Sequence, residues 1–285
     1  MNYTKQHTWL LLLLLYHDGV GGRRYHLLVS GHRQCHEFVS DPYPGEIPTG
    51  SFAIRGGYVE EVRHTDVGMV FDRGASVGEW LAHDGSRPTA LDGSYVPMLA
   101  YGSNACPGRL VEKFGAQFHV EESELDRIVA LAVTVAAVAR AWTCRLTQHG
   151  ILPVTLAPSV GRELDCHVLL LPRRLVPLMD ASEGRGGRFY SVTRLTTTNV
   201  TLPGGGIWHA PITYLGKSSR APLVVDGAVQ FFDEVGSDAA QAAIAEGRGT
   251  CGERFLLPHE DIDDETPLID IVDAQRRDQP VFELL

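Results

Sequence analysis

Continuous apolar stretches separated by polar, glycine- and proline-rich turns predict a domain of short helices and buried strands. The longest apolar run, residues 128–141, has the length of a helix, but its four valines and one threonine favour strands. Two further strands are predicted at residues 152–157 and 165–171, with a turn at 158–161 between them. A strand pair is predicted at 189–200 and 207–215, and shorter strands are predicted at 51–55 and 67–71.

Helix signals are fewer and shorter. Pro107 suits the first turn of a helix that Gly115 ends. Residues 172–183 predict a second helix, which Gly184 ends, and the alanine-rich residues 237–246 predict a third with Ser237 as its cap. Short capping-box signals also occur, at Ser76 and Glu79. Strands and helices in this mixture indicate the α+β class.

One turn has the form of a site. The strand predicted up to residue 100 is followed by a small polar turn and then at once by the helix at Pro107; the turn consists of Tyr101, Gly102, Ser103, Asn104 and Ala105. Such a turn presents backbone N–H groups to one concavity, which favours carboxylates and developing oxyanions. Most turns between a strand and a helix are only connections, so the turn alone assigns no function.

The N-terminal part resists assignment. Six leucines at residues 10–15 are too few to cross a membrane, which takes about 20 apolar residues. Lys5 precedes them as in a secretory signal, but no small-residue cleavage site follows, so a buried strand or helix is favoured. The run could also precede the true start of the protein. Residues 36–57 are rich in Pro, Gly and Ser and predict loops and turns.

Composition excludes some classes of partner. The chain has 285 residues and a formal net charge of −10, which argues against nucleic acid because phosphate binding needs a basic surface. The length allows one large domain, or one domain with sizeable extensions. We expect neither a nucleic-acid nor a membrane partner, and the oligomeric state is not predicted.

Cysteine and histidine spacing favours no metal or disulfide framework. The five cysteines are widely spaced and include no C-x-x-C pair, which indicates a reducing cytoplasm. His32, Cys35 and His36 have metal-like spacing without a second ligand cluster, so solvated loop side chains are favoured. The acidic residues 260–265 lack the alternation and glycine of a calcium loop and are interpreted as a solvated face.

Two segments together carry a family resemblance. An apolar strand ends in Tyr101-Gly102-Ser103-Asn104, and about eighty residues later Leu178-Met179-Asp180-Ala181-Ser182-Glu183-Gly184 is followed by Tyr190. In order and spacing these segments resemble the γ-glutamylcyclotransferase-like superfamily, in its Tyr-Gly-Ser-Asn branch. The resemblance covers residues 95–232. The chain departs from the family pattern at pocket-wall and packing positions, namely Ala105, Cys166 and Met179.

The resemblance implies an architecture and a domain division. The fold expected is a small mixed, mostly antiparallel β-barrel with flanking short helices. Residues 95–232 would form this domain, residues 1–94 an N-terminal extension with a possible β-rich subdomain, and residues 233–285 a C-terminal extension with one helix and an acidic tail.

The resemblance also implies the site. Glu183 falls on the family's catalytic glutamate, and Tyr190 on its downstream tyrosine; the turn Tyr101, Gly102, Ser103, Asn104 and Ala105 would bind substrate. Without that context Glu183 would pass for a solvated residue and Tyr190 for packing. Asp180 more plausibly caps or orients, and Ser103 and Cys106 lack the partners of a nucleophile. Neither a metal nor an organic cofactor is implied.

The activity implied is cleavage of a small-molecule γ-glutamyl amide, releasing 5-oxoproline and a free amine. The Asn104 branch points to γ-glutamyl amino acids or amines, and some relatives remove γ-glutamyl protecting groups in natural-product pathways. Two alternatives stay open, hydrolysis of a related amide and a binding or interaction module without catalysis. The cyclisation requires the carboxylate of Glu183 to face the turn at residues 101–105 across a single small pocket.

Overall fold

The computed structural model describes residues 33–81, 94–122, 125–185 and 189–262. The described residues belong to one compact unit that begins at His32. The leucine run at 10–15, His32 and the end of the acidic stretch lie outside the described residues.

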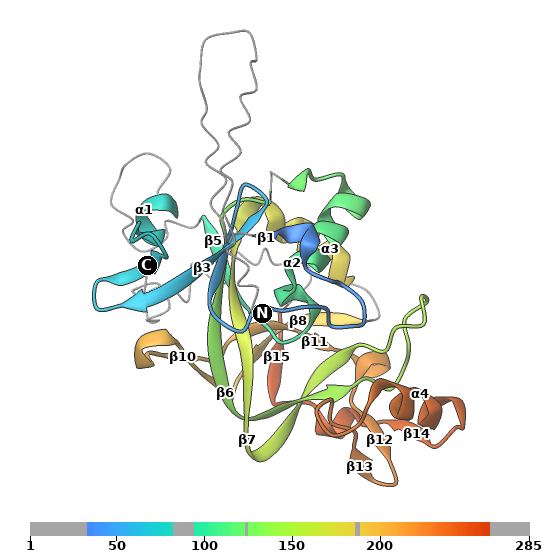
Figure 1. Cartoon of the computed structure of the whole chain (residues 1–285). Helices are drawn as coiled ribbons and strands as arrows, with labels where there is room; N and C mark the ends of the chain where they lie inside the picture. The colour runs from blue at the N-terminus through green and yellow to red at the C-terminus, as the bar shows by residue number, and fades with distance from the viewer. Residues whose placement is uncertain (1–32, 82–93, 123–124, 186–188, 263–285) are drawn as a thin grey trace, which may run out of the picture. The chain divides into compact units, whose positions relative to one another are not determined.

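The two longest strands lie at the centre of the sheet. β6 (Ile128–Trp142) and β7 (Val154–Pro172) pair antiparallel along almost their whole lengths (Figure 1). Their pairing shifts register between Ala136 and Val138, opposite residues 158–163. The turn predicted at 158–161 is therefore wrong: its Pro-Ser-Val-Gly signal marks a bulge inside one continuous strand. A bulge absorbs extra residues while the partner strand goes on pairing on both sides of it.

The other strands extend this pair on both sides. Among the described pairs, only β5 with β11 is parallel. The order is β1 (Arg33–Gln34), β3 (Tyr58–Thr65), β2 (Phe52–Arg55), β6, β7, β5 (Tyr95–Ala100), β11 (Ile212–Gly216), β8 (Tyr190–Leu195) and β15 (His259–Asp261). Off this path are β4 (Gly68–Phe71), β9 (Asn199–Thr201) and β10 (Ile207–His209).

This arrangement confirms the α+β class with a largely antiparallel sheet. The sheet is not the closed barrel implied by the resemblance, because β1 and β15 end an open path of pairings among the described strands. The division of the chain into a core and two extensions stays a prediction. Nevertheless β1, β2 and β3 come from the predicted N-terminal extension and pair into the same sheet as β6 and β7.

The strand pair predicted at 189–200 and 207–215 is broken into four strands, β8 to β11. Ala210 has a positive φ of 48°, and its N–H donates to the Thr198 carbonyl at 3.0 Å. Pro211 follows and has no N–H to continue a ladder. β8 consequently pairs with β11, and β9 pairs separately with β10.

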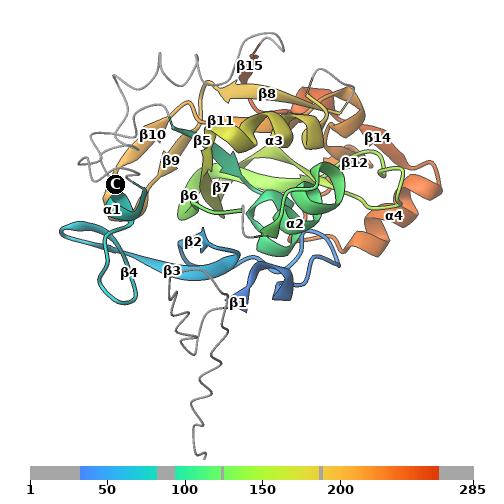
Figure 2. The same ribbon diagram turned by 90° about the horizontal axis from the view of Figure 1, so that it is seen from above.

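The helices are short. They are α1 (Val77–Leu81), α2 (Pro107–Val111), α3 (Val176–Glu183) and α4 (Ser237–Ala245). α2 continues into a π-helical turn, Glu112–Ala116, and α3 lies beside that turn (Figure 2). Gly184 has a φ of 67° and ends α3 as the sequence predicts, whereas the cap position of α4 is Gly236 and not the predicted Ser237.

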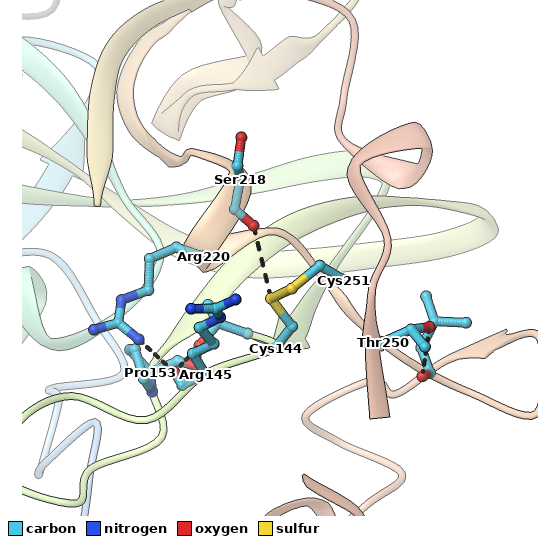
Figure 3. The surroundings of a disulfide bond; sticks show 9 residues. Cys144, Arg145, Pro153, Ser218, Arg220, Thr250 and Cys251 are labelled. Carbon is cyan, nitrogen blue, oxygen red and sulfur yellow. Dashed lines mark hydrogen bonds between the residues drawn. A yellow bond between two sulfur atoms is a disulfide. The ribbon is translucent and has the colours of Figure 1, made fainter. Parts of the chain in front are cut away.

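A second, three-stranded sheet is cross-linked by a disulfide to the segment that follows β6. β13 (Ala228–Val229), β12 (Leu223–Val225) and β14 (Gly249–Cys251) lie with α4 (orange and red in Figure 1). A disulfide joins Cys251 to Cys144, so the prediction that the cysteines form no disulfide is wrong for this pair. Figure 3 shows the bond beside the Ser218 carbonyl, which lies 3.7 Å from the Cys144 sulfur. Disulfides persist in oxidising compartments, whereas the sequence analysis predicts a reducing cytoplasm. The disulfide and the predicted location therefore disagree.

Residues 35–45 pack closely against the turn and α2. A Cβ on Gly108 would lie 2.0 Å from the Phe38 carbonyl oxygen, and a Cβ on Gly45 would lie 2.7 Å from the Cys106 sulfur. Neither position has room for a side chain. The loop predicted for this segment is thus held against the candidate site, and it carries Tyr43 there.

Candidate functional site

Glu183 and the turn share one cation. The Lys113 ammonium contacts the Glu183 carboxylate, and the same nitrogen donates to the Asn104 side-chain oxygen at 2.5 Å. The Glu183 side chain is 12% exposed and that of Lys113 is 19% exposed. The carboxylate at the end of α3 therefore lies next to the turn at residues 101–105. The catalytic and binding roles of these residues stay predictions.

The position of Glu183 depends on how α3 is anchored. Met179 is fully buried in the core. Asp180 accepts a hydrogen bond from the Tyr214 hydroxyl at 2.5 Å and pairs with the Arg185 guanidinium at 2.9 Å. Because Gly184 turns the chain at once after Glu183, the carboxylate lies at a fixed point where helix and loop meet. These contacts anchor Asp180 on α3, and its expected role of capping or orienting, not reacting, stays a prediction.

Two backbone hydrogen bonds form within the turn itself. Ala105 donates its N–H to the Gly102 carbonyl at 3.1 Å, and Cys106 donates to the Ser103 carbonyl at 3.0 Å. The amide of Ala105 is therefore engaged within the turn, and α2 has only five residues. The Tyr101 ring is buried and its hydroxyl donates to the Tyr214 carbonyl at 2.6 Å, which ties the turn to β11.

Tyr43 reaches this turn from the N-terminal segment. The Tyr43 hydroxyl oxygen accepts from the Val154 N–H at 3.4 Å and hydrogen-bonds the backbone of Ser103. It also lies so close to Gly102 that a Cβ there would be 2.7 Å from it. The Tyr190 hydroxyl donates to the Val154 carbonyl at 3.4 Å, so both phenols meet at the first residue of β7.

Burial and negative charge keep these phenols protonated. Burial raises the pKa of Tyr43 to about 12, and the Glu183 charge adds to the rise. Burial likewise raises the pKa of the phenols of Tyr101, Tyr190 and Tyr214 well above the usual value, and in all three the Glu183 carboxylate contributes. We call these four residues the tyrosine cluster. All four phenols lie near enough to Glu183 for its charge to add to the rise in their pKa.

Sequence patterns identified only part of this site. Tyr43 lies between two prolines in a segment that predicts a loop, and no periodicity marks it. Only one feature of the sequence sets Lys113 apart, namely that lysines make up only three of the 25 basic residues. Cys106 is buried and its thiol pKa is raised, chiefly by burial, which suits a packed side chain better than a nucleophile.

Other regions of the described structure offer fewer groups that could bind or react with a ligand. No group of three or more His, Cys, Asp and Glu side chains among the described residues could hold a metal ion. His36 contacts Glu122 at 2.9 Å. A cavity of about 290 Å³ lies between residues 38–41 and α2, and neither Glu183 nor the 101–105 turn lines it. No described helix has the length and apolar character needed to cross a membrane.

Comparisons give matches in structure only. No family model matches the chain, and neither does any curated protein. A solved structure described as a γ-glutamyl cyclotransferase is 17% identical, covering 43% of this chain and 67% of its own, with a TM-score of 0.32. YkqA from Bacillus subtilis is 13% identical, covering 78% and 70%, with a TM-score of 0.34. A Homo sapiens protein described as uncharacterized is 15% identical, covering 64% and 99%, with a TM-score of 0.33.

Proposed function

We propose that this chain cleaves a γ-glutamyl amide by attack of the substrate's own α-amine, releasing 5-oxoproline and a free amine. Glu183 acts as general base and then as general acid. The 101–105 turn and Tyr190 bind the glutamyl group. The substrate class follows from the resemblance of the Tyr-Gly-Ser-Asn and Glu183–Tyr190 segments to the γ-glutamylcyclotransferase-like superfamily.

The observation that carries the proposal is the shared cation, Lys113, between Glu183 and Asn104. It joins two segments that the resemblance pairs but that lie far apart in the sequence. A general base must come within hydrogen-bond reach of the proton that it removes, so a carboxylate turned away from the turn could not serve. The limited exposure of Glu183 fits a group that works inside a site.

The reaction closes a five-membered ring. The α-ammonium passes a proton to the Glu183 carboxylate, and the freed nitrogen attacks the γ-carbonyl carbon. The C–N bond of the amide then breaks as the departing nitrogen takes a proton from Glu183. The carboxylate next accepts one of the two protons on the new ring nitrogen, which keeps the other, and passes it to the released amine, which leaves as an ammonium. Holding the amine and carbonyl together can supply about 7–11 kcal/mol of the barrier, and the proton transfers about 10²–10⁴-fold.

Within the tyrosine cluster, the neutral hydroxyl of Tyr190 suits a developing oxyanion, whereas those of Tyr101 and Tyr214 already donate to the Tyr214 carbonyl and to Asp180. A phenol that keeps its proton donates a hydrogen bond without adding negative charge beside Glu183. Tyr190 donates at 3.4 Å to the Val154 carbonyl, a long bond that a substrate oxygen can replace.

The test is product analysis with a panel of γ-glutamyl amino acids and γ-glutamyl amines, followed by mass spectrometry. 5-Oxoproline supports the proposal. Glutamate instead would mean hydrolysis by water, and binding without turnover would mean a module without catalysis. Either result overturns the cyclisation.

The matched variants are Glu183→Gln and Glu112→Gln. Glu112 lies on the same π-helical turn as Lys113 but pairs with Arg109, and its side chain is 48% exposed. We expect Glu183→Gln to lower kcat by about 10²–10⁴-fold and Glu112→Gln to leave it within about twofold. Full activity of Glu183→Gln would refute the assigned role.

A further inference from the structure

Lys113 places a positive charge directly against the proposed general base. Its ammonium contacts the Glu183 carboxylate and the Asn104 side-chain oxygen, and it projects from the π-helical turn Glu112–Ala116. π-Helical turns are frequent at functional sites. The two charged side chains are mostly shielded from water, so they form a small site of paired opposite charges beside the 101–105 turn.

The choice of lysine is informative in this chain. The chain has 22 arginines and three lysines among 25 basic residues, and yet a lysine occupies this position. A lysine ammonium is a compact charge on a flexible stem, whereas a guanidinium is a rigid planar fork. A flexible cation can leave one carboxylate for another while the helix that carries it stays in place.

The paired charges match one chemical feature of the proposed substrate. A γ-glutamyl amide carries an ammonium and a carboxylate on the same carbon. Glu183 must accept the proton of that ammonium, which leaves the carboxylate needing a cation nearby. An ion pair in the empty site can be exchanged for two ion pairs with such a zwitterion without leaving either protein charge unmatched.

We propose that Lys113 binds the α-carboxylate of the substrate, so that the Lys113–Glu183 pair opens to hold the zwitterionic end of a γ-glutamyl amide. This inference rests on the proposed function and adds the residue that selects for an α-carboxylate. Asn104, freed from Lys113, keeps its side-chain oxygen beside the incoming α-ammonium.

The test compares two substrates that differ in one group. L-γ-Glutamyl-L-alanine carries the α-carboxylate, and 4-aminobutanoyl-L-alanine lacks it but cyclises in the same way to 2-pyrrolidinone. For Lys113→Met we expect kcat/KM on the glutamyl substrate to fall about 10- to 100-fold, as for loss of a charge-assisted hydrogen bond. On the analogue that lacks the carboxylate it should change less than about threefold.

Conservative and matched variants separate binding from positioning. Lys113→Arg keeps the charge and should retain most of the preference for the carboxylated substrate. Arg109→Met removes a cation from α2 that pairs with Glu112 and should leave the preference unchanged. If Lys113→Met lowers turnover of both substrates equally, Lys113 only positions Glu183 and the inference is wrong. Melting temperatures of all variants show whether each one folds.

A binding measurement keeps this inference separate from the proposed reaction. By calorimetry, L-glutamine should bind the wild-type protein more tightly than 4-aminobutanamide, which lacks only the α-carboxylate. Lys113→Met should remove that difference. Binding with this pattern but no turnover of any γ-glutamyl amide would refute the reaction and uphold the role of Lys113. Equal binding of the two ligands by the wild-type protein would overturn the role of Lys113.

Discussion

The hydroxyl of Tyr43 lies against Gly102, so close that a Cβ on the glycine would be 2.7 Å from the phenol oxygen. The contact joins a loop at the N-terminal side of the domain to the turn proposed to bind substrate. The same oxygen bonds the Ser103 backbone and accepts from the Val154 N–H. Gly102 is therefore required by the close approach of another side chain.

Substituting Gly102→Ala should push the Tyr43 ring away from the turn. We expect a loss of about 1–3 kcal/mol in the free energy of unfolding, as for overpacking of a filled site. In a Tyr43→Phe background the loss should be smaller, because the atom in the way is gone. Urea unfolding of the four proteins gives the coupling between the two positions.

The control for that series is Gly50→Ala. A Cβ at Gly50 would meet no atom within 4 Å, and the residue does not have a positive φ. Its unfolding free energy should change by less than about 0.5 kcal/mol. Identical losses for Gly102→Ala with and without the Tyr43 hydroxyl would show that the contact does not matter.

Asp180 should be worth more to stability than an exposed acid. Its side chain is 18% exposed, that of Arg185 is 8% exposed, and Tyr214 donates to it. Asp180→Ala leaves a shielded guanidinium without this carboxylate, so we expect a cost of about 3–5 kcal/mol. Thermal and urea unfolding measure it.

Asp233→Ala is the comparison, because Asp233 pairs with Arg140 but its side chain is 53% exposed. There we expect about 1 kcal/mol or less. Because Asp180 is also expected to orient α3, Asp180→Asn should lower kcat while Asp233→Asn should not. Equal effects of the two alanine variants on stability would contradict the anchoring role of Asp180.

The sequence predicted the segments whose secondary structure is determined by residues within the segment itself. β6 was predicted from its run of β-branched residues, and the end of α3 from Gly184, because both signals lie within the element itself. β3 went unpredicted: it carries Glu60, Glu61 and Arg63, and no alternation of apolar residues marks it as a strand. Its place comes from pairing with β2 and β4, which is information outside the segment.

The residues of the candidate site also fall into two groups, those marked by a local motif and those placed by contacts between distant segments. The turn and Glu183 belong to motifs that can be recognised in the sequence. Tyr43 and the Cys144–Cys251 disulfide depend on contacts between distant segments, and the disulfide spans 107 residues. Nothing in the spacing of five scattered cysteines specifies which two come together. Long-range packing therefore decides the part of the site that motifs leave open.

The disulfide should stabilise the fold measurably. Closing a loop of 107 residues restricts the unfolded chain, and removal of such a bond typically costs about 2–5 kcal/mol. We expect the double variant Cys144→Ala/Cys251→Ala to lose an amount in this range in urea. Thiol titration of the denatured, unreduced protein should find the three cysteines that are free, Cys35, Cys106 and Cys166. Five titratable thiols would show that the bond is not formed.

Alkaline pH should unfold the protein through the tyrosine cluster. Burial raises the pKa of Tyr43 to about 12, and the phenol of an unfolded chain titrates near about 10. Between these values the folded state binds more protons than the unfolded state, so stability is complete below about pH 10 and falls as the pH rises toward 12. Tyr101, Tyr190 and Tyr214 have raised pKa values for the same reason and steepen the fall.

Melting temperatures measured from pH 8 to 11 test this dependence, and absorbance at 295 nm reports the phenolates. Tyr43→Phe removes one titrating group, so its melting temperature should fall less steeply above pH 10 than that of the wild-type protein. Tyr58→Phe is the control, because Tyr58 lies on β3 and contacts Gln34. Its slope should match the wild type. If Tyr43→Phe also follows the wild-type slope, the Tyr43 hydroxyl is not held in its neutral form beside Gly102, and the contact that links the N-terminal segment to the turn is absent in solution.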